Sequence, residues 1–120
     1  MEHLLNRNIG IGIDIVDIAR FRKISFSIKK SFYKRIFLES EIKYCLRFKD
    51  PSTHFAAKFA IKEAVKKSIQ ENIDFLDVET FHLRQKPAIR LKSNKKYIFI
   101  LSVSHDKNIA TAVVISEKID

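Results

Sequence analysis

The sequence has one cysteine, two prolines, two glycines and no tryptophan among its 120 residues. The single cysteine, Cys45, excludes an internal disulfide and a zinc site built from several thiolates. No apolar run approaches the ~20 residues of a membrane-spanning helix, because the longest, 97–101, is only as long as a strand. Residues 1–7 contain no hydrophobic stretch fit for a secretory signal. These absences predict a reduced, cytoplasmic protein with no membrane association.

The chain also lacks a Pro/Gly-rich linker, an internal repeat and a low-complexity tract, so we expect one domain over residues 1–120. At 46% hydrophobic and 31% charged residues, the composition is globular and argues against disorder. Both glycines fall within 10–12. That concentration makes this segment a candidate site.

Hydrophobic periodicity predicts an α+β fold. Apolar residues spaced by three to four positions indicate helices over 18–37, 39–48, and from a cap at Ser52 or Thr53 to about Gln70. Alternating or short apolar runs indicate strands over 9–16, 78–83, 88–91, 97–103 and 109–115. The first helical segment is expected to break near 25–27. We therefore expect a largely antiparallel β-sheet packed against a long helix and shorter helices.

The net charge is +9, from 23 Lys and Arg against 14 Asp and Glu. Between Asp17 and Glu39 the chain has no acid and seven cations, Arg20, Arg22, Lys23, Lys29, Lys30, Lys34 and Arg35. Such a run predicts a docking surface for a polyanion, which charge alone does not identify. A nucleic-acid-binding module is one alternative, but the run lacks exposed aromatics and the chain has no recognisable RNA-binding motif.

Asp14 lies in a predicted strand of isoleucines, where Asp is disfavoured, and it shares a face with Gly10 and Gly12. The absent glycine side chains allow a ligand or another backbone to come close. We interpret the glycines as clearing the strand face beside Asp14. The alternative is an aspartate that caps the following helix.

Glu63 lies within a mostly apolar face of the long predicted helix, where an unpaired carboxylate is costly. An ordinary ion pair with Lys66 or Lys67 would explain it. A second misplaced acid, Asp14, favours a different hypothesis, because Mg²⁺ commonly takes one or two protein carboxylates and fills its other positions with water and phosphate oxygens. The two acids are therefore a candidate magnesium site.

The turn Ser104-His105-Asp106-Lys107 is a further candidate, because Ser, His and Lys side chains can hold phosphate oxygens. A polar hairpin turn is the structural alternative. A Ser-His-Asp triad is not supported, because triad members meet in space rather than as neighbours in one turn.

Three segments together resemble the holo-acyl-carrier-protein synthases, a branch of the phosphopantetheinyl transferases. Residues 10–18, GIGIDIVDI, are similar to the family's opening G-x-G-x-D-I-V-[ED]-I. Residues 58–67, KFAIKEAVKK, are similar to R-F-A-x-K-E-A-x-x-K, and residues 102–112 are similar to S-[IV]-S-H-x-x-x-x-A-x-A. Residues 35–37 with Glu41, and Lys86-Pro87, also echo family positions. The resemblance covers nearly the whole chain in order.

The resemblance implies transfer of 4′-phosphopantetheine from coenzyme A to a serine of apo-acyl carrier protein, for fatty acid synthesis. By position, Asp14 and Glu63 are implied to hold Mg²⁺, and Lys62, Ser104 and His105 to contact coenzyme A. The base for the serine proton is a metal-bound water or Glu63, of which the water is favoured. Arg20, Arg22 and Lys23 are the expected dock for the acidic carrier. The resemblance also implies a homotrimer with sites between subunits.

The sequence departs from the family pattern in its loops. No glycine follows the KEA helix at 68–72, and Gln85 stands where a glycine is usual before Lys-Pro. Ile109 replaces a common tyrosine. A relative that keeps the fold but has lost turnover is therefore a third hypothesis, beside the transferase and the nucleic-acid-binding module.

Overall fold

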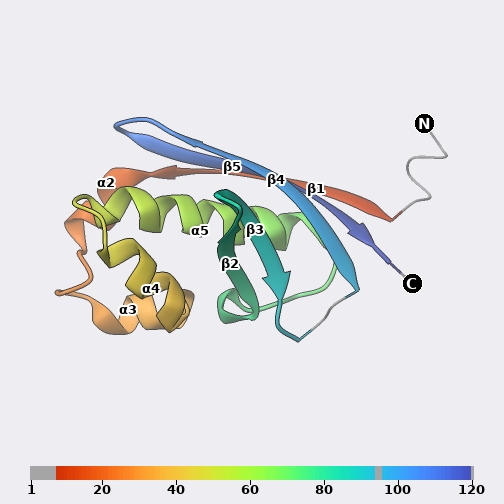
Figure 1. Ribbon diagram of the computed structural model, residues 1–120, viewed down its shortest axis with the longest axis horizontal. Helices are drawn as coiled ribbons and strands as arrows, with labels where there is room; N and C mark the ends of the chain where they lie inside the picture. The colour runs from red at the N-terminus through yellow and green to blue at the C-terminus, as the bar shows by residue number, and fades with distance from the viewer. Residues whose placement is uncertain (1–7, 94–95, 120) are drawn as a thin grey trace.

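The computed structural model describes residues 8–93 and 96–119 (Figure 1). Residues 1–7, which bear on the prediction about a secretory signal, lie outside the described part. The long helix α5 (Pro51–Ser68) runs through the centre. A three-stranded sheet lies along one side of α5, and two shorter helices and a two-stranded sheet lie on the other (Figure 1). None of the described helices is long and apolar enough to cross a membrane.

The larger sheet is entirely antiparallel, with strand order β1-β5-β4. Its strands are β1 (Ile9–Asp17), β5 (Ile109–Lys118) and β4 (Tyr97–His105). The smaller sheet is the hairpin of β2 (Val78–Leu83) and β3 (Lys86–Leu91). The α+β class and the antiparallel pairing are confirmed, but the strands form two sheets rather than one. Pro87 in β3 has no backbone N–H to donate, which suits an edge position.

The inner face of the larger sheet packs on α5 through small side chains. Ala110 and Ala112 of β5 are buried, as are Ala60 and Ala64 of the helix. Small residues let the helix and the sheet approach closely, as the dense packing of protein interiors requires. This close contact with α5 positions the side chains on the inner face of β1.

The two glycines serve this close approach. A Cβ on Gly12 would lie 2.0 Å from the backbone oxygen of Ala64, and one on Gly10 would lie 1.7 Å from that of Ser68. The interpretation that the glycines leave the strand face beside Asp14 clear is therefore wrong. The absent side chains could admit either a ligand or another backbone, and the backbone of α5 fills the space.

The outer face of the same sheet carries isoleucines that are largely exposed. Ile11, Ile13 and Ile15 of β1 are 65%, 59% and 65% exposed, and Ile98 and Ile100 of β4 are 52% and 67% exposed. Alternation along each strand puts these side chains opposite the helix. No other described element lies over this face in Figure 1. Exposed apolar faces of this kind are typical of interaction surfaces.

The helices follow the predicted order, with their ends shifted by one or two residues. The first helical segment divides into α2 (Ile18–Lys23) and α3 (Lys30–Ile36), as expected from the break near 25–27. A third short helix, α4, spans Glu39–Leu46. The prediction that Ser52 or Thr53 caps the long helix is wrong, because α5 begins at Pro51 after Asp50. Proline is favoured at the first helical position, where its missing N–H costs nothing.

Candidate active site

Asp14 lies on the inner face of β1, at the edge of the contact with α5. Its side chain is only 14% exposed, and its Oδ1 is 3.1 Å from the Nζ of Lys67. The same ammonium donates to the backbone oxygen of Ile13 at 3.0 Å. Asp17, by contrast, accepts a hydrogen bond from the backbone N–H of Ala19 and caps α2. The helix-capping alternative thus applies to Asp17 and not to Asp14.

Glu63 stands beside this pair. It precedes Lys67 by four residues, so the two side chains are neighbours on one helical face. Glu63 is partly exposed and forms no hydrogen bond or ion pair with any residue of 8–93 or 96–119. The alternative that Glu63 merely pairs with Lys66 or Lys67 is not observed, because Lys67 contacts Asp14 and Lys66 lies over the ring of Phe75.

Asp14 and Glu63 carry the type of ligand that a hard divalent cation takes. Carboxylate oxygens are the ligands that Mg²⁺ takes in proteins. Asp14 already lies beside one positive charge, the Lys67 ammonium. The Lys67 side chain is 54% exposed, so this position is open to solvent. Within the described residues, no cluster of three or more His, Cys, Asp or Glu side chains is arranged to hold a metal. Two protein ligands are within the range that is usual for Mg²⁺.

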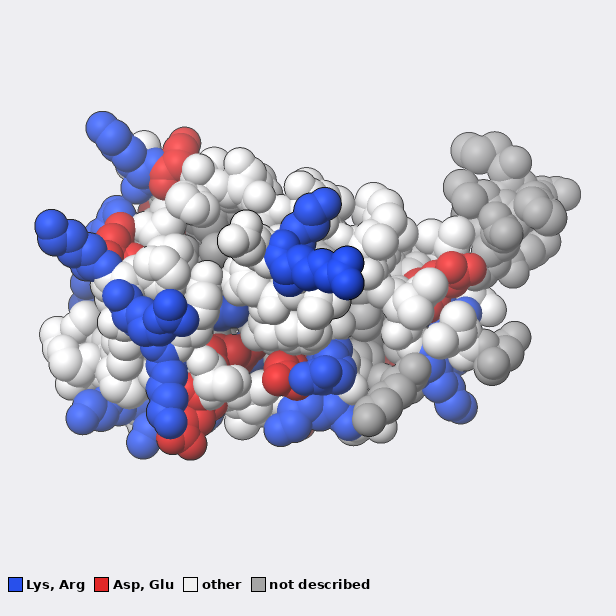
Figure 2. All heavy atoms as spheres, viewed as in Figure 1, with Lys and Arg blue, Asp and Glu red and all other residues white. Residues whose placement is uncertain are grey.

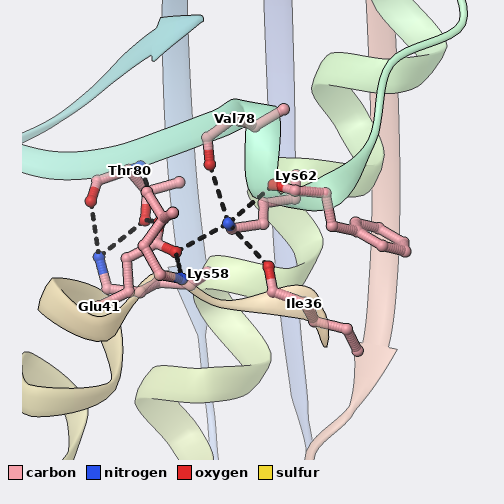
Figure 3. Close-up of polar contacts among 8 residues, drawn as sticks. Ile36, Glu41, Lys58, Lys62, Val78 and Thr80 are labelled. Carbon is pink, nitrogen blue, oxygen red and sulfur yellow. Dashed lines mark hydrogen bonds and ion pairs between the residues drawn. The ribbon is translucent and has the colours of Figure 1, made fainter. Parts of the chain in front are cut away.

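Lys62, the residue before Glu63, is fully buried. Figure 3 shows the polar contacts around its ammonium. Its Nζ is 2.7 Å from Oε1 of Glu41 and 2.8 Å from the backbone oxygen of Val78. It also donates to the backbone oxygens of Ile36 and Phe75 at 2.9 and 3.0 Å. Four oxygens thus surround an ammonium that has three hydrogens. The structure contradicts the implied contact with coenzyme A phosphates and the implied catalytic role, because no donor of Lys62 remains free.

Glu41 continues this buried network into the hairpin (Figure 3). One carboxylate oxygen accepts the backbone N–H of Leu38 at 2.7 Å, and the other accepts that of Thr80 at 2.8 Å. The Thr80 hydroxyl in turn accepts from Nζ of Lys58 at 2.9 Å. Burial lowers the pKa of Lys62, and the Glu41 carboxylate opposes that shift. The network therefore ties α4 and β2 to α5.

Ser104 and His105 are adjacent at the end of β4 but lie on opposite faces of the sheet. Ser104 is exposed on the face that carries Ile98 and Ile100. His105 turns toward α5, where its ring centroid is 6.5 Å from that of His54. Asp106 is committed to the turn, since its Oδ1 accepts the backbone N–H groups of Asn108 and Ile109.

Several residues at these sites were not predicted. Lys67 is the last lysine of the K-E-A-x-x-K pattern, and its i, i+4 spacing from Glu63 was the available signal. His54 and His82 carried no signal in the sequence, because they come from α5 and β2 and meet His105 only in the folded chain. All three histidines line one cavity.

The carboxylates and the histidines face different sides of α5. Glu63 follows His54 by nine residues, which at 100° per residue is a rotation of about 180°. Asp14 and Glu63 face the rim beside β1, whereas His54, Lys58 and His105 line a cavity of about 220 Å³ on the other side of the helix. One chain therefore presents two separate half-sites.

The predicted docking residues lie at the α2 end, where Lys and Arg side chains gather (Figure 2). Arg20 is exposed, and its guanidinium lies 5.5 Å from the ring centroid of Phe59. Arg22 bonds Asp50 at 2.8 Å and the backbone oxygen of Lys107 at 3.2 Å. Hydrogen bonds from Thr53 and Arg22 hold the pKa of Asp50 below its usual value. Arg22 thus also joins α2 to α5 and to the β4–β5 turn, whereas Lys23 is exposed.

A profile of the 4′-phosphopantetheinyl transferase superfamily matches residues 10–114, which include both carboxylates and the β4–β5 turn. The chain therefore belongs to that superfamily. Its curated relatives include the holo-[acyl-carrier-protein] synthases of Thermodesulfovibrio yellowstonii, 37% identical over 88% of this chain and 96% of the relative. That of Chlamydia pneumoniae is 38% identical over 90% and 96%. Within the superfamily, the chain is an enzyme of the holo-[acyl-carrier-protein] synthase type.

Solved structures agree with this assignment. The holo-(acyl-carrier-protein) synthase of Bacillus anthracis, in complex with coenzyme A (3′,5′-ADP), has a TM-score of 0.79 and 32% identity, covering 91% of this chain and 96% of its own. The synthase of Helicobacter pylori, in complex with coenzyme A, has a TM-score of 0.75 and 36% identity, covering 89% and 99%. The predicted family and fold are confirmed.

Proposed function

We propose that this chain transfers 4′-phosphopantetheine from coenzyme A to a serine of apo-acyl carrier protein in a Mg²⁺-dependent reaction that supplies fatty acid synthesis. Adenosine 3′,5′-bisphosphate is the second product. The observation that carries the proposal is the convergence of Asp14, Glu63 and Lys67 at one solvent-facing rim of a chain of this superfamily. The two relatives solved with coenzyme A support the donor.

In the proposed reaction the serine oxygen attacks the phosphorus that bears the pantetheine. The bond from that phosphorus to the bridging diphosphate oxygen breaks, and the bisphosphate leaves. Asp14 and Glu63 would hold Mg²⁺, which supplies neutralisation of charge on the diphosphate. Lys67 places a second positive charge at the same rim. A carboxylate that holds the cation is a poor base, so the serine proton would pass to a water molecule held at the cation rather than to Asp14 or Glu63.

A mass-shift assay tests the proposed function. The protein is incubated with apo-acyl carrier protein, coenzyme A and Mg²⁺, and the carrier is weighed by mass spectrometry. We expect the carrier to gain one phosphopantetheine, and to gain none when EDTA is present. Binding of coenzyme A without any gain in carrier mass would identify a relative that has kept the fold and lost the turnover.

We further propose that the working enzyme is a homotrimer with composite sites. The two half-sites lie on opposite sides of α5, so one coenzyme A reaches a carboxylate pair and a histidine cavity most directly when they belong to different subunits. The exposed isoleucines of β1 and β4 offer the interface, because burying apolar area drives association. Ser104, on the same outer face, would then come close to a neighbouring subunit.

Ile13→Lys is expected to dissociate the assembly, because it places a charge in the centre of this apolar face. We expect a monomer by size-exclusion chromatography with light scattering, and at least a tenfold loss of transfer because each site then lacks its second half. Ile28→Lys is the matched control. Ile28 is 69% exposed but lies in the loop between α2 and α3, away from the sheet. An unchanged molecular mass for Ile13→Lys would rule out this interface.

Arg20→Glu is expected to weaken the binding of the carrier protein and not the binding of coenzyme A. Reversing a charge at a docking surface opposes an acidic partner, and we expect the KM for apo-acyl carrier protein to rise about tenfold while that for coenzyme A changes less than twofold. Lys92→Glu makes the same charge change beyond β3 and is the control. Equal effects of Arg20→Glu on both KM values would show that the α2 surface is not the dock.

A further inference from the structure

Three of the four histidines of the chain come together in one cavity of about 220 Å³. His54 comes from α5, His82 from β2 and His105 from β4. Tyr44 of α4 and Lys58 of α5 complete the polar part of the lining. The proposed function brings coenzyme A to this cavity but gives His54 and His82 no role in binding it.

The walls of the cavity are held in place by the buried network. Lys58 is 5% exposed and donates to the hydroxyl of Thr80, which in turn donates to the Glu41 carboxylate. His82 lies against the Tyr44 ring with centroids 4.8 Å apart, and its Nε2 is 3.4 Å from the Tyr44 hydroxyl oxygen. The cavity is therefore lined by flat rings and one fixed positive charge, which suits a nucleotide that carries a phosphate group.

His54 and His82 both favour the neutral imidazole when the cavity holds no ligand. Burial first, and then the neighbouring His105, lower the pKa of His54, while Asp50 opposes and Lys58 and His82 add to the lowering. Burial and Lys58 lower the pKa of His82. The groups that face them are Tyr44 from α4, Lys58 and Asp50 from the long helix and its start, and His105 from β4. A dianion in this cavity would offset these effects and favour the charged imidazolium.

We propose that His54 and His82 are nucleotide-binding residues that take up protons when the phosphomonoester of coenzyme A enters this cavity. The proposal rests on the proposed function, since it takes the donor from there. Coenzyme A has one phosphomonoester, on its adenosine, whereas its diphosphate is a diester and does not titrate near neutral pH. The bound state holds more protons than the free state. Affinity therefore rises as pH falls, until the phosphate itself protonates near its pKa of about 6.

Calorimetric titration of the intact protein with coenzyme A, at pH 6.5 and pH 8.0, tests the proposal. We expect about a tenfold weaker Kd at pH 8.0, with net proton uptake shown by heats that depend on the ionisation enthalpy of the buffer. Dephospho-coenzyme A lacks the phosphomonoester and keeps the diphosphate, so its Kd should change less than twofold over the same range. The double variant His54→Gln/His82→Gln keeps His105, and its Kd for coenzyme A should change less than about threefold over the same range.

Tyr44→Phe is the control, because it keeps the ring against His82 and removes no titrating imidazole, so it should retain the pH dependence. The proposal is overturned by a flat profile in the unmodified protein, by an unchanged profile in the double variant, or by an equal profile with dephospho-coenzyme A. Any of these with normal carrier modification leaves the proposed function intact. No binding of coenzyme A and no carrier modification would overturn both.

Discussion

Asp14→Asn and Glu63→Gln are each expected to lower kcat/KM for modification of apo-acyl carrier protein about a thousandfold. The physical reason is that a bound divalent cation contributes several kcal/mol of transition-state charge stabilisation, and each variant removes one of its two protein ligands. Steady-state kinetics at saturating Mg²⁺ measure this effect. Mg²⁺ titration by calorimetry should show weaker binding in both variants, which links the loss of activity to the cation.

Asp17→Asn and Glu39→Gln are the matched controls. Asp17 caps α2 three residues after Asp14, and Asn is an equally good cap. Glu39 is an exposed glutamate of α4 whose only described partner is Lys43, on the same helix. Both controls should retain activity within about twofold of the unmodified protein, since neither side chain lies at the rim. Activity near the unmodified level in Asp14→Asn or Glu63→Gln would show that the carboxylate pair is not the metal site.

Lys62→Met is expected to destabilise the protein by about 3–5 kcal/mol, because it leaves the Glu41 carboxylate buried without its cation. Three backbone oxygens, from Ile36, Phe75 and Val78, also lose their donor. Urea denaturation measures the change in the free energy of unfolding. Under conditions in which the variant remains folded, kcat per folded molecule should be close to that of the unmodified protein.

Lys66→Met is the control for this substitution. Lys66 is the same residue type on the same helix, and its ammonium lies 4.0 Å from the Phe75 ring centroid at a partly exposed position. We expect its loss to cost about 1 kcal/mol or less. The opposite pattern in Lys62→Met, with stability retained and turnover lost, would restore the role in phosphate binding that the family resemblance implied.

The fold was predictable where the signal was local. The alternation of Ile9, Ile11, Ile13 and Ile15 depends only on the two-residue period of a strand, and β1 lies where that period placed it. The break between α2 and α3 likewise follows from local spacing. The cap of α5 was misplaced because Ser52 and Thr53 are strong caps in general, whereas Pro51 fixed the first helical position.

The roles of individual residues were less predictable, because burial depends on segments distant in sequence. Lys62 and Glu63 are adjacent, yet one is enclosed by oxygens from three other segments and the other faces the rim beside Asp14. Helix geometry turns successive side chains by about 100°, so neighbours in a motif need not share a function. The resemblance identified the motif correctly and assigned Lys62 within it incorrectly.

The sequence by itself determined the enzyme family, the order of helices and strands, the excess of positive charge and the two candidate metal ligands. Each of these is encoded in local pattern or in motifs at fixed spacing. Only the tertiary structure decided that the glycines admit the backbone of α5 and that three histidines share a cavity. It also decided that Lys62 is buried and links α5 to α4 and β2. These are properties of long-range packing, in which the position of each side chain is set by elements that the local sequence does not specify.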